Sequence, residues 1–230
     1  MELRLDDAEL AAVDELADAI GRDYGRPDHP ELLVEAPALA CRLPGRIPHF
    51  LNRFRRTEAG HCLIRGHHVD QDRLGPTPGH WKNAEDPQRT LRFDVRLVLY
   101  SAVLGDVFGW ATQQDGRIIN DVLPIKGNET KQLGSASDVY MHFHTEDPFH
   151  EHRPDFVTLA CLRNPDRTAT TMGHIDDVAI DPRDAEVLFE PRFVITPDEA
   201  HLSSNNTLPH NAFAGIEELL HRPPPVAVLY

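Results

Sequence analysis

Residues 141–152 read Met141-His142-Phe143-His144-Thr145-Glu146-Asp147-Pro148-Phe149-His150-Glu151-His152. The first of them end a stretch, residues 139–144, that is typical of a β-strand. Successive strand residues point to opposite faces, so His142, His144 and Glu146 would share one face. A histidine and a carboxylate two residues apart at a strand end can bind one metal ion from the same side. The pattern therefore predicts a metal site at His144 and Glu146.

Such a pair is two thirds of the facial triad of two histidines and one carboxylate, which leaves positions on iron open for a co-substrate and dioxygen. A plainer interpretation is a polar strand face in a chain with 14 histidines. A cupin site is a third possibility, because His142-Phe143-His144 is a His-x-His motif. That site needs a glutamate a few residues later, where Pro148 and Phe149 stand instead, so the spacing disfavours it.

Composition narrows the class of protein. The chain has 230 residues, 40% of them hydrophobic and 26% charged, which is typical of a folded globular protein. The net charge of −14 argues against nucleic-acid or anionic-membrane partners, because both would repel it. The three cysteines form no Cys-x-x-Cys pair, the N-terminus lacks a signal-peptide pattern, and no apolar run is long enough to cross a bilayer. We therefore expect a cytoplasmic protein with reduced thiols.

Apolar periodicity predicts helices in the first half of the chain and short strands after it. One helix would start after Asp6 or Asp7 and end at Gly21 or Gly25, a second would follow Pro48, and a third would span residues 91–104. Strands are expected at residues 61–69, 110–114, 117–123, 139–144, 156–162, 168–173 and 193–195, with the start of one more at 226–230, and a further helix at residues 182–189. Asp115-Gly116 predicts a tight hairpin turn between the second and third of these strands. The fold class is therefore α+β, in a single domain over residues 1–230.

The stretch beginning at His144-Thr145-Glu146 resembles the clavaminate-synthase-like oxygenases, the family that hydroxylates arginine, asparagine and lysine at the β or γ carbon. The matching segments follow the family order along nearly the whole chain: residues 63–66, 74–78, 109–117, 144–150, 153–156, 159–164, 168–171 and 193–198. The resemblance implies a double-stranded β-helix, or jelly-roll, core flanked by helices. It also implies Fe(II) as cofactor, 2-oxoglutarate and dioxygen as co-substrates, and an amino acid, free or carrier-bound, as substrate.

The resemblance also implies roles for individual residues. His144 and Glu146 would bind the iron, and Thr171, or Thr170 beside it, would hold the carboxylate of 2-oxoglutarate. Gln113 and Glu146 would contact the substrate amino group, and Ser135 would line the substrate pocket. Residues 147–152 match a segment that closes over the substrate.

The family places a second histidine ligand, and then an arginine for 2-oxoglutarate, much further along the chain than His144. Four later histidines are poor substitutes by their context: His174, His201, His210 and His221. The sequence therefore predicts two ligands of three and a jelly roll whose last strands are missing. Two hypotheses remain: an amino-acid hydroxylase completed by another fragment or in an oligomer, or an inactive remnant that binds a ligand or partner.

Overall fold

The computed structural model describes residues 1–57, 59–83, 86–131 and 134–230. The chain divides into two compact units, each built from two stretches of sequence. Unit 1 comprises residues 1–109 and 158–171, and unit 2 comprises residues 110–157 and 172–230. The expectation of a single domain over residues 1–230 stays a prediction.

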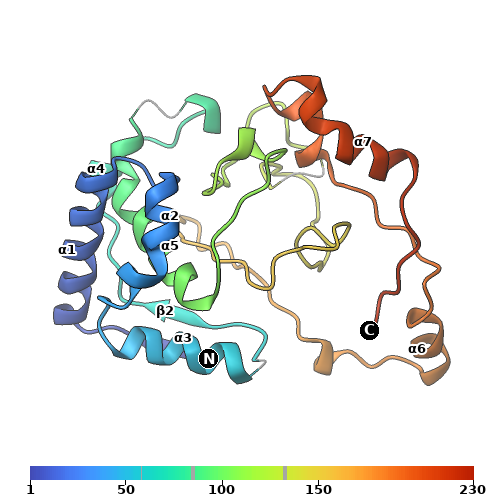
Figure 1. Cartoon of the computed structure of the whole chain (residues 1–230), viewed down its shortest axis with the longest axis horizontal. Coiled ribbons are helices and arrows are strands. Elements are labelled where there is room, and N and C mark those ends of the chain that lie inside the picture. The colour runs from blue at the N-terminus through green and yellow to red at the C-terminus, as the bar shows by residue number, and fades with distance from the viewer. Residues whose placement is uncertain (58, 84–85, 132–133) are drawn as a thin grey trace. The chain divides into compact units, whose positions relative to one another are not determined.

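Unit 1 is a helical layer beside a small sheet. Its helices are α1 (Asp7–Tyr24), α2 (Pro30–Ala40), α3 (Arg46–Thr57), α4 (Gln71–Leu74) and α5 (Leu91–Leu104), with short 3-10 turns η1 (Trp81–Asn83) and η2 (Pro87–Arg89). Strands β1 (Glu2–Arg4) and β2 (Leu63–Arg65) pair in parallel, with Leu3 opposite Ile64. Figure 1 shows α5 among the other helices, and it packs against α1, α2 and α3.

The predicted helices of unit 1 are confirmed, and the structure adds two more, α2 and α4. α1 begins at a capping box, in which the Asp6 carboxylate accepts from the Glu9 amide and the Glu9 carboxylate from the Asp6 amide, and ends at Gly25 with a φ of 74°. α5 has the predicted bounds, and α3 starts two residues before Pro48, which a first helical turn tolerates. α2 was not predicted, because Pro37 lies inside it.

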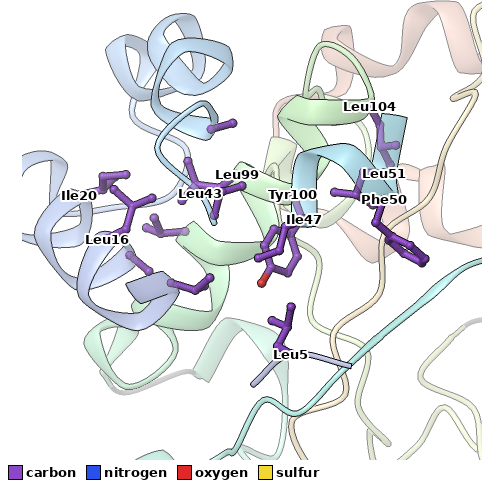
Figure 2. Packing of buried hydrophobic residues seen from close by; sticks show 14 of the residues in the cluster. Leu5, Leu16, Ile20, Leu43, Ile47, Phe50, Leu51, Leu99, Tyr100 and Leu104 are labelled. Atoms are coloured by element: carbon purple, nitrogen blue, oxygen red, sulfur yellow. The ribbon is translucent and has the colours of Figure 1, made fainter. Parts of the chain in front are cut away.

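The core of unit 1 is apolar and excludes solvent. Val13 and Ile20 of α1, Leu32 of α2, Ile47 of α3 and Leu99 of α5 are 0–1% exposed. Figure 2 shows labelled members of this cluster, contributed by helices far apart in the sequence. Each such side chain contributes about 1.5–3 kcal/mol through burial, which is why the helices of this unit assemble.

Unit 2 has little regular structure among its described residues. Its elements are η3 (Gln114–Gly116), η4 (Ile175–Asp177), α6 (Pro182–Leu188), η5 (Glu199–His201), η6 (Ser203–Asn205), η7 (His210–Phe213) and α7 (Ala214–His221). The predicted helix at residues 182–189 is confirmed as α6. Of the strands predicted at 193–195 and 226–230, one antiparallel bridge forms, between Phe193 and Val226.

The strand predicted at residues 61–69 is confirmed as β2 of unit 1, whereas the strands predicted at 110–114, 117–123, 139–144, 156–162 and 168–173 do not form ladders in the described part of the chain. The hairpin around Asp115-Gly116 is wrong: η3 occupies the turn and no strand flanks it. Asp115 does adopt the left-handed conformation that a hairpin turn requires, with a φ of 60°. Its amide donates to Asn206 and its carboxylate accepts from the Thr207 amide, so the turn pairs with a distant loop and not with its own flanks.

Residues 139–144, 156–162 and 168–173 also lack strand pairing. Alternating polarity reports which side chains prefer burial, whereas a strand also needs a neighbour whose amides and carbonyls face it. The structure therefore shows an α+β chain with few strands. No helix of the described residues is long and apolar enough to span a membrane.

Candidate metal centre

His144 and Glu146 lie side by side in unit 2. The His144 Nε2 atom is 3.7 Å from Glu146 Oε1, and both side chains are about half exposed. The segment is irregular and not a strand, yet it brings together the two side chains that strand periodicity placed on one face. The pair therefore presents an imidazole nitrogen and a carboxylate to the same region of solvent.

The ring orientation of His144 suits a metal ligand. Its Nδ1 atom lies 2.7 Å from the backbone carbonyl of His142. A carbonyl can only accept, so Nδ1 donates its proton to it, and Nε2 is the ring nitrogen turned toward Glu146. A metal-ligating histidine characteristically donates its other ring N–H to a carbonyl or carboxylate, which fixes its tautomer. The donor set of the pair thus fits Fe(II), for which imidazole and carboxylate are usual ligands.

The electrostatics around Glu146 favour a cation. Burial raises the pKa of the Glu146 carboxyl, and the neighbouring carboxylates of Asp147 and Asp198 raise it further, whereas His144 acts in the opposite direction. Three carboxylates near one point repel one another, and a bound cation would relieve that repulsion.

A second group of possible ligands lies next to the pair. Asp147, Asp198 and His201 place ligand atoms within 4.8 Å of one another, and the described residues hold no other such group of three. Both nitrogens of His201 are already engaged, Nδ1 with the Thr112 hydroxyl and Nε2 with Asp147, at 2.9 Å each. His201 is fully buried and Asp198 is exposed, and a metal bound by His201 would have to replace one of these two hydrogen bonds. The half-exposed pair of His144 and Glu146 is therefore the better candidate for the iron site.

The remaining predicted site residues lie in other local structures. Gln113 accepts from the Asn120 amide at 3.2 Å, and the Ser135 hydroxyl accepts from the Asn128 amide at 3.0 Å, both within unit 2. Thr171 is exposed at the end of the second stretch of unit 1. Their roles stay predictions.

Sequence reasoning missed the buried network around Asp147. Its carboxylate accepts from the Trp110 indole and pairs with His201, which lies 54 residues further along the chain. The resemblance places Asp147 in a segment that closes over the substrate, and the sequence context of His201 makes it a poor third ligand. No local sequence signal connects them, because a pairing over this separation depends on the fold.

Unit 1 has a surface hollow of about 500 Å³. It is lined by Gln71 and residues 161–165. Arg163 is held there by Gln71, Thr77 and the Gly75 carbonyl. None of the predicted ligands lines it, so it does not define the metal centre.

Comparisons with known proteins identify the family. No family model matches the chain. An enduracididine beta-hydroxylase from Streptomyces hygroscopicus is 38% identical in an alignment that covers the whole chain and 71% of that relative. The chain belongs to the clavaminate-synthase-like iron oxygenases. An L-ornithine/L-arginine 3-hydroxylase from Catenulispora acidiphila is 48% identical over 85% of the chain.

Solved structures agree with this membership of the clavaminate-synthase-like oxygenases. The non-haem iron oxygenase OrfP, in complex with Fe, succinate and (3S)-hydroxy-L-Arg, matches with a TM-score of 0.94 and 44% identity. The match covers the whole chain and 70% of OrfP. The chain spans 57% of the length of the L-ornithine/L-arginine 3-hydroxylase, so it corresponds to a little over half of that relative.

Proposed function

We propose that His144 and Glu146 supply two of the three iron ligands of an Fe(II)/2-oxoglutarate-dependent oxygenase that hydroxylates an unactivated carbon of an amino acid. The proposal rests on the half-exposed pair of His144 and Glu146. Nε2 of His144 lies 3.7 Å from Glu146, and Nδ1 is hydrogen-bonded to the His142 carbonyl. Bound iron would supply the activation of dioxygen at the expense of 2-oxoglutarate. Family membership and the OrfP complex with Fe and alpha-ketoglutaric acid support this assignment.

An arginine-like or lysine-like substrate, free or carrier-bound, is favoured. The L-ornithine/L-arginine 3-hydroxylase and the OrfP complexes with arginine derivatives are named for basic amino acids. The net charge of −14 also suits a cationic substrate, because it lowers the cost of bringing one to the surface. Within this proposal Gln113, Ser135 and Glu146 contact the substrate and Thr171 contacts 2-oxoglutarate.

The third ligand and the jelly-roll core belong to the same proposal. The one described group of three ligand side chains includes neither His144 nor Glu146. Apolar side chains of unit 2, among them Tyr140, Phe143 and Val194, are exposed and would suit a covering layer of strands. Both the strands and the third ligand would come from a segment like the unmatched part of the relatives. That segment would lie in the same polypeptide, in a complementing fragment or in a second copy. The three free cysteines are in keeping with a reducing, cytoplasmic setting.

Metal binding and turnover test the proposal separately. Titration of the 230-residue chain with Mn(II), an iron analogue that does not oxidise in air, should show weak binding that His144→Ala and Glu146→Ala each reduce by at least tenfold. A matched control, His142→Ala, removes a neighbouring histidine side chain but keeps the backbone carbonyl that holds the His144 ring, and it should bind Mn(II) as the unmodified chain does. Unchanged binding in His144→Ala and Glu146→Ala would contradict the site.

Turnover is measured as succinate release and as an arginine product heavier by one oxygen atom. We expect very low turnover from the 230-residue chain, and an increase when the part of the L-ornithine/L-arginine 3-hydroxylase that lies outside the match is added in trans or fused. Rapid turnover by the chain alone would contradict the claim that a ligand is missing. The rival hypothesis is an inactive binding module. It predicts that the protein binds substrate but forms no product, even after the missing segment is added.

A further inference from the structure

Asp147 is held in an unusual backbone conformation directly after Glu146. Its φ is 46°, in the left-handed region that non-glycine residues seldom adopt. It also precedes Pro148, and residues before a proline normally take an extended conformation. Strain of this kind persists where the surroundings impose it, and it concentrates at functional sites.

The surroundings that impose it are hydrogen bonds to a buried carboxylate. Asp147 is 7% exposed and His201 is 0% exposed. One carboxylate oxygen accepts from the Trp110 indole, and the other lies 2.9 Å from Nε2 of His201. Since a carboxylate can only accept, Nε2 of His201 carries a proton and donates it into this bond.

His201 is itself fixed on its other side. Its Nδ1 atom lies 2.9 Å from the Thr112 hydroxyl, and the edge of its ring packs against Phe149, with centroids 4.9 Å apart. The side-chain amide of Asn206 donates to the carbonyls of Thr112, Ala200 and Leu202. The loops that carry Trp110, Thr112 and His201 are therefore bound to one another beneath Asp147.

We propose that Asp147 and His201 are positioning residues: their buried pair fixes the backbone after Glu146 so that its carboxylate stays beside Nε2 of His144. This inference rests on the proposed role of Glu146 as a ligand. Glu146 precedes the residue held in the left-handed conformation, so release of Asp147 would allow that backbone to relax. The Glu146 carboxylate would then sample orientations away from His144.

Mn(II) affinity of the 230-residue chain tests the proposal without any turnover. Asp147→Asn keeps the shape of the side chain but weakens its bonds to Trp110 and His201, and we expect a 10- to 100-fold loss of affinity, as for other residues that orient metal ligands. His201→Gln retains a donor in place of Nε2 and should recover most of the affinity, whereas His201→Leu should lose it. A change of less than twofold in Asp147→Asn, while Glu146→Ala lowers affinity as proposed, would overturn the positioning role.

A control separates positioning from general destabilisation. Phe213 is 1% exposed in unit 2, and Phe213→Leu should lower the melting temperature while the folded protein keeps its Mn(II) affinity. An equal loss of affinity in Phe213→Leu would show that Asp147 acts only through stability.

Failure of the proposed function has a distinct signature. If His144→Ala and Glu146→Ala leave Mn(II) binding intact while Asp147→Asn and Asp198→Asn abolish it, the metal occupies the group of Asp147, Asp198 and His201. That result would overturn both proposals. Loss of binding in all of these variants except Asp198→Asn supports both.

Discussion

His67 connects the loop after β2 to α5, and its environment makes the stability of unit 1 depend on pH. Its Nε2 atom lies 2.8 Å from the Tyr100 hydroxyl and its Nδ1 atom 2.9 Å from the Arg96 guanidinium. Burial lowers the pKa of His67 to about 4, and the positive charge of Arg96 contributes in the same direction. The nearby carboxylate of Asp14, 3.5 Å from Arg96, faces the guanidinium. We expect unit 1 to lose stability in mild acid through this histidine.

The sign and size follow from proton linkage. An unfolded histidine has a pKa of about 6.5, so between pH 6.5 and pH 4 the unfolded chain binds a proton that the folded chain does not. Stability contributed by neutral His67 is therefore complete above pH 6.5 and is lost as the pH falls to about 4. The difference in pKa corresponds to about 3 kcal/mol in full, at about 1.4 kcal/mol per pKa unit, and to about 2 kcal/mol between pH 7 and pH 4.5.

Urea unfolding of the chain, followed by the helical circular dichroism signal from pH 7 to pH 4.5, measures this loss. His67→Gln removes the titrating group and should lose about 2 kcal/mol less than the unmodified chain over that range. His68 is exposed, so His68→Gln is a matched control that should behave as the unmodified chain does. Parallel stability curves for His67→Gln and the unmodified chain would refute the reasoning.

Two further predictions concern unit 1. Leu99 is fully buried on α5, so Leu99→Ala should lower the free energy of unfolding by about 2–5 kcal/mol. Val34 is exposed on α2, so Val34→Ala should change the free energy of unfolding by less than about 0.5 kcal/mol. Gly66→Ala should cost about 1–3 kcal/mol, because Gly66 has a φ of 116° and an added Cβ would lie 3.2 Å from the Leu5 carbonyl. Gly25→Ala, at a φ of 74° with open space around it, should cost less; equal losses at the two glycines would contradict the steric part of this reasoning.

The helices of unit 1 could be predicted because their signals are local. The Asp6 cap, the apolar stripe of α1 and the glycine at its end all act within a few residues. The same holds for α5, whose predicted bounds agree with the structure. α2 escaped prediction because Pro37 inside it is normally a helix breaker, and the packing of α2 on α5 offsets that cost.

The strands of unit 2 could not be predicted in the same way. Their apolar alternation is local, but the pairing that makes a strand is not. Asp115, in the predicted hairpin turn, is hydrogen-bonded to Asn206 and Thr207 instead. In predictability, the pair of His144 and Glu146 lies between the predictable helices and the unpredictable strands. Residues 144 and 146 are only two apart in the sequence, so a local pattern could place their side chains together, and they lie 3.7 Å apart although the segment is not a strand.

The sequence by itself determined the helices α1, α3 and α5 and the proximity of His144 and Glu146, because each depends on residues close together in the chain. It also carried the family resemblance, through short segments that match in order along the chain. Only the tertiary structure decided that the Asp147 carboxylate lies buried against His201 and the Trp110 indole. The physical reason is the sequence separation over which each interaction acts. Periodicity and caps act over one or two turns, whereas a buried charge is placed only where distant loops meet to exclude water and complete its hydrogen bonds.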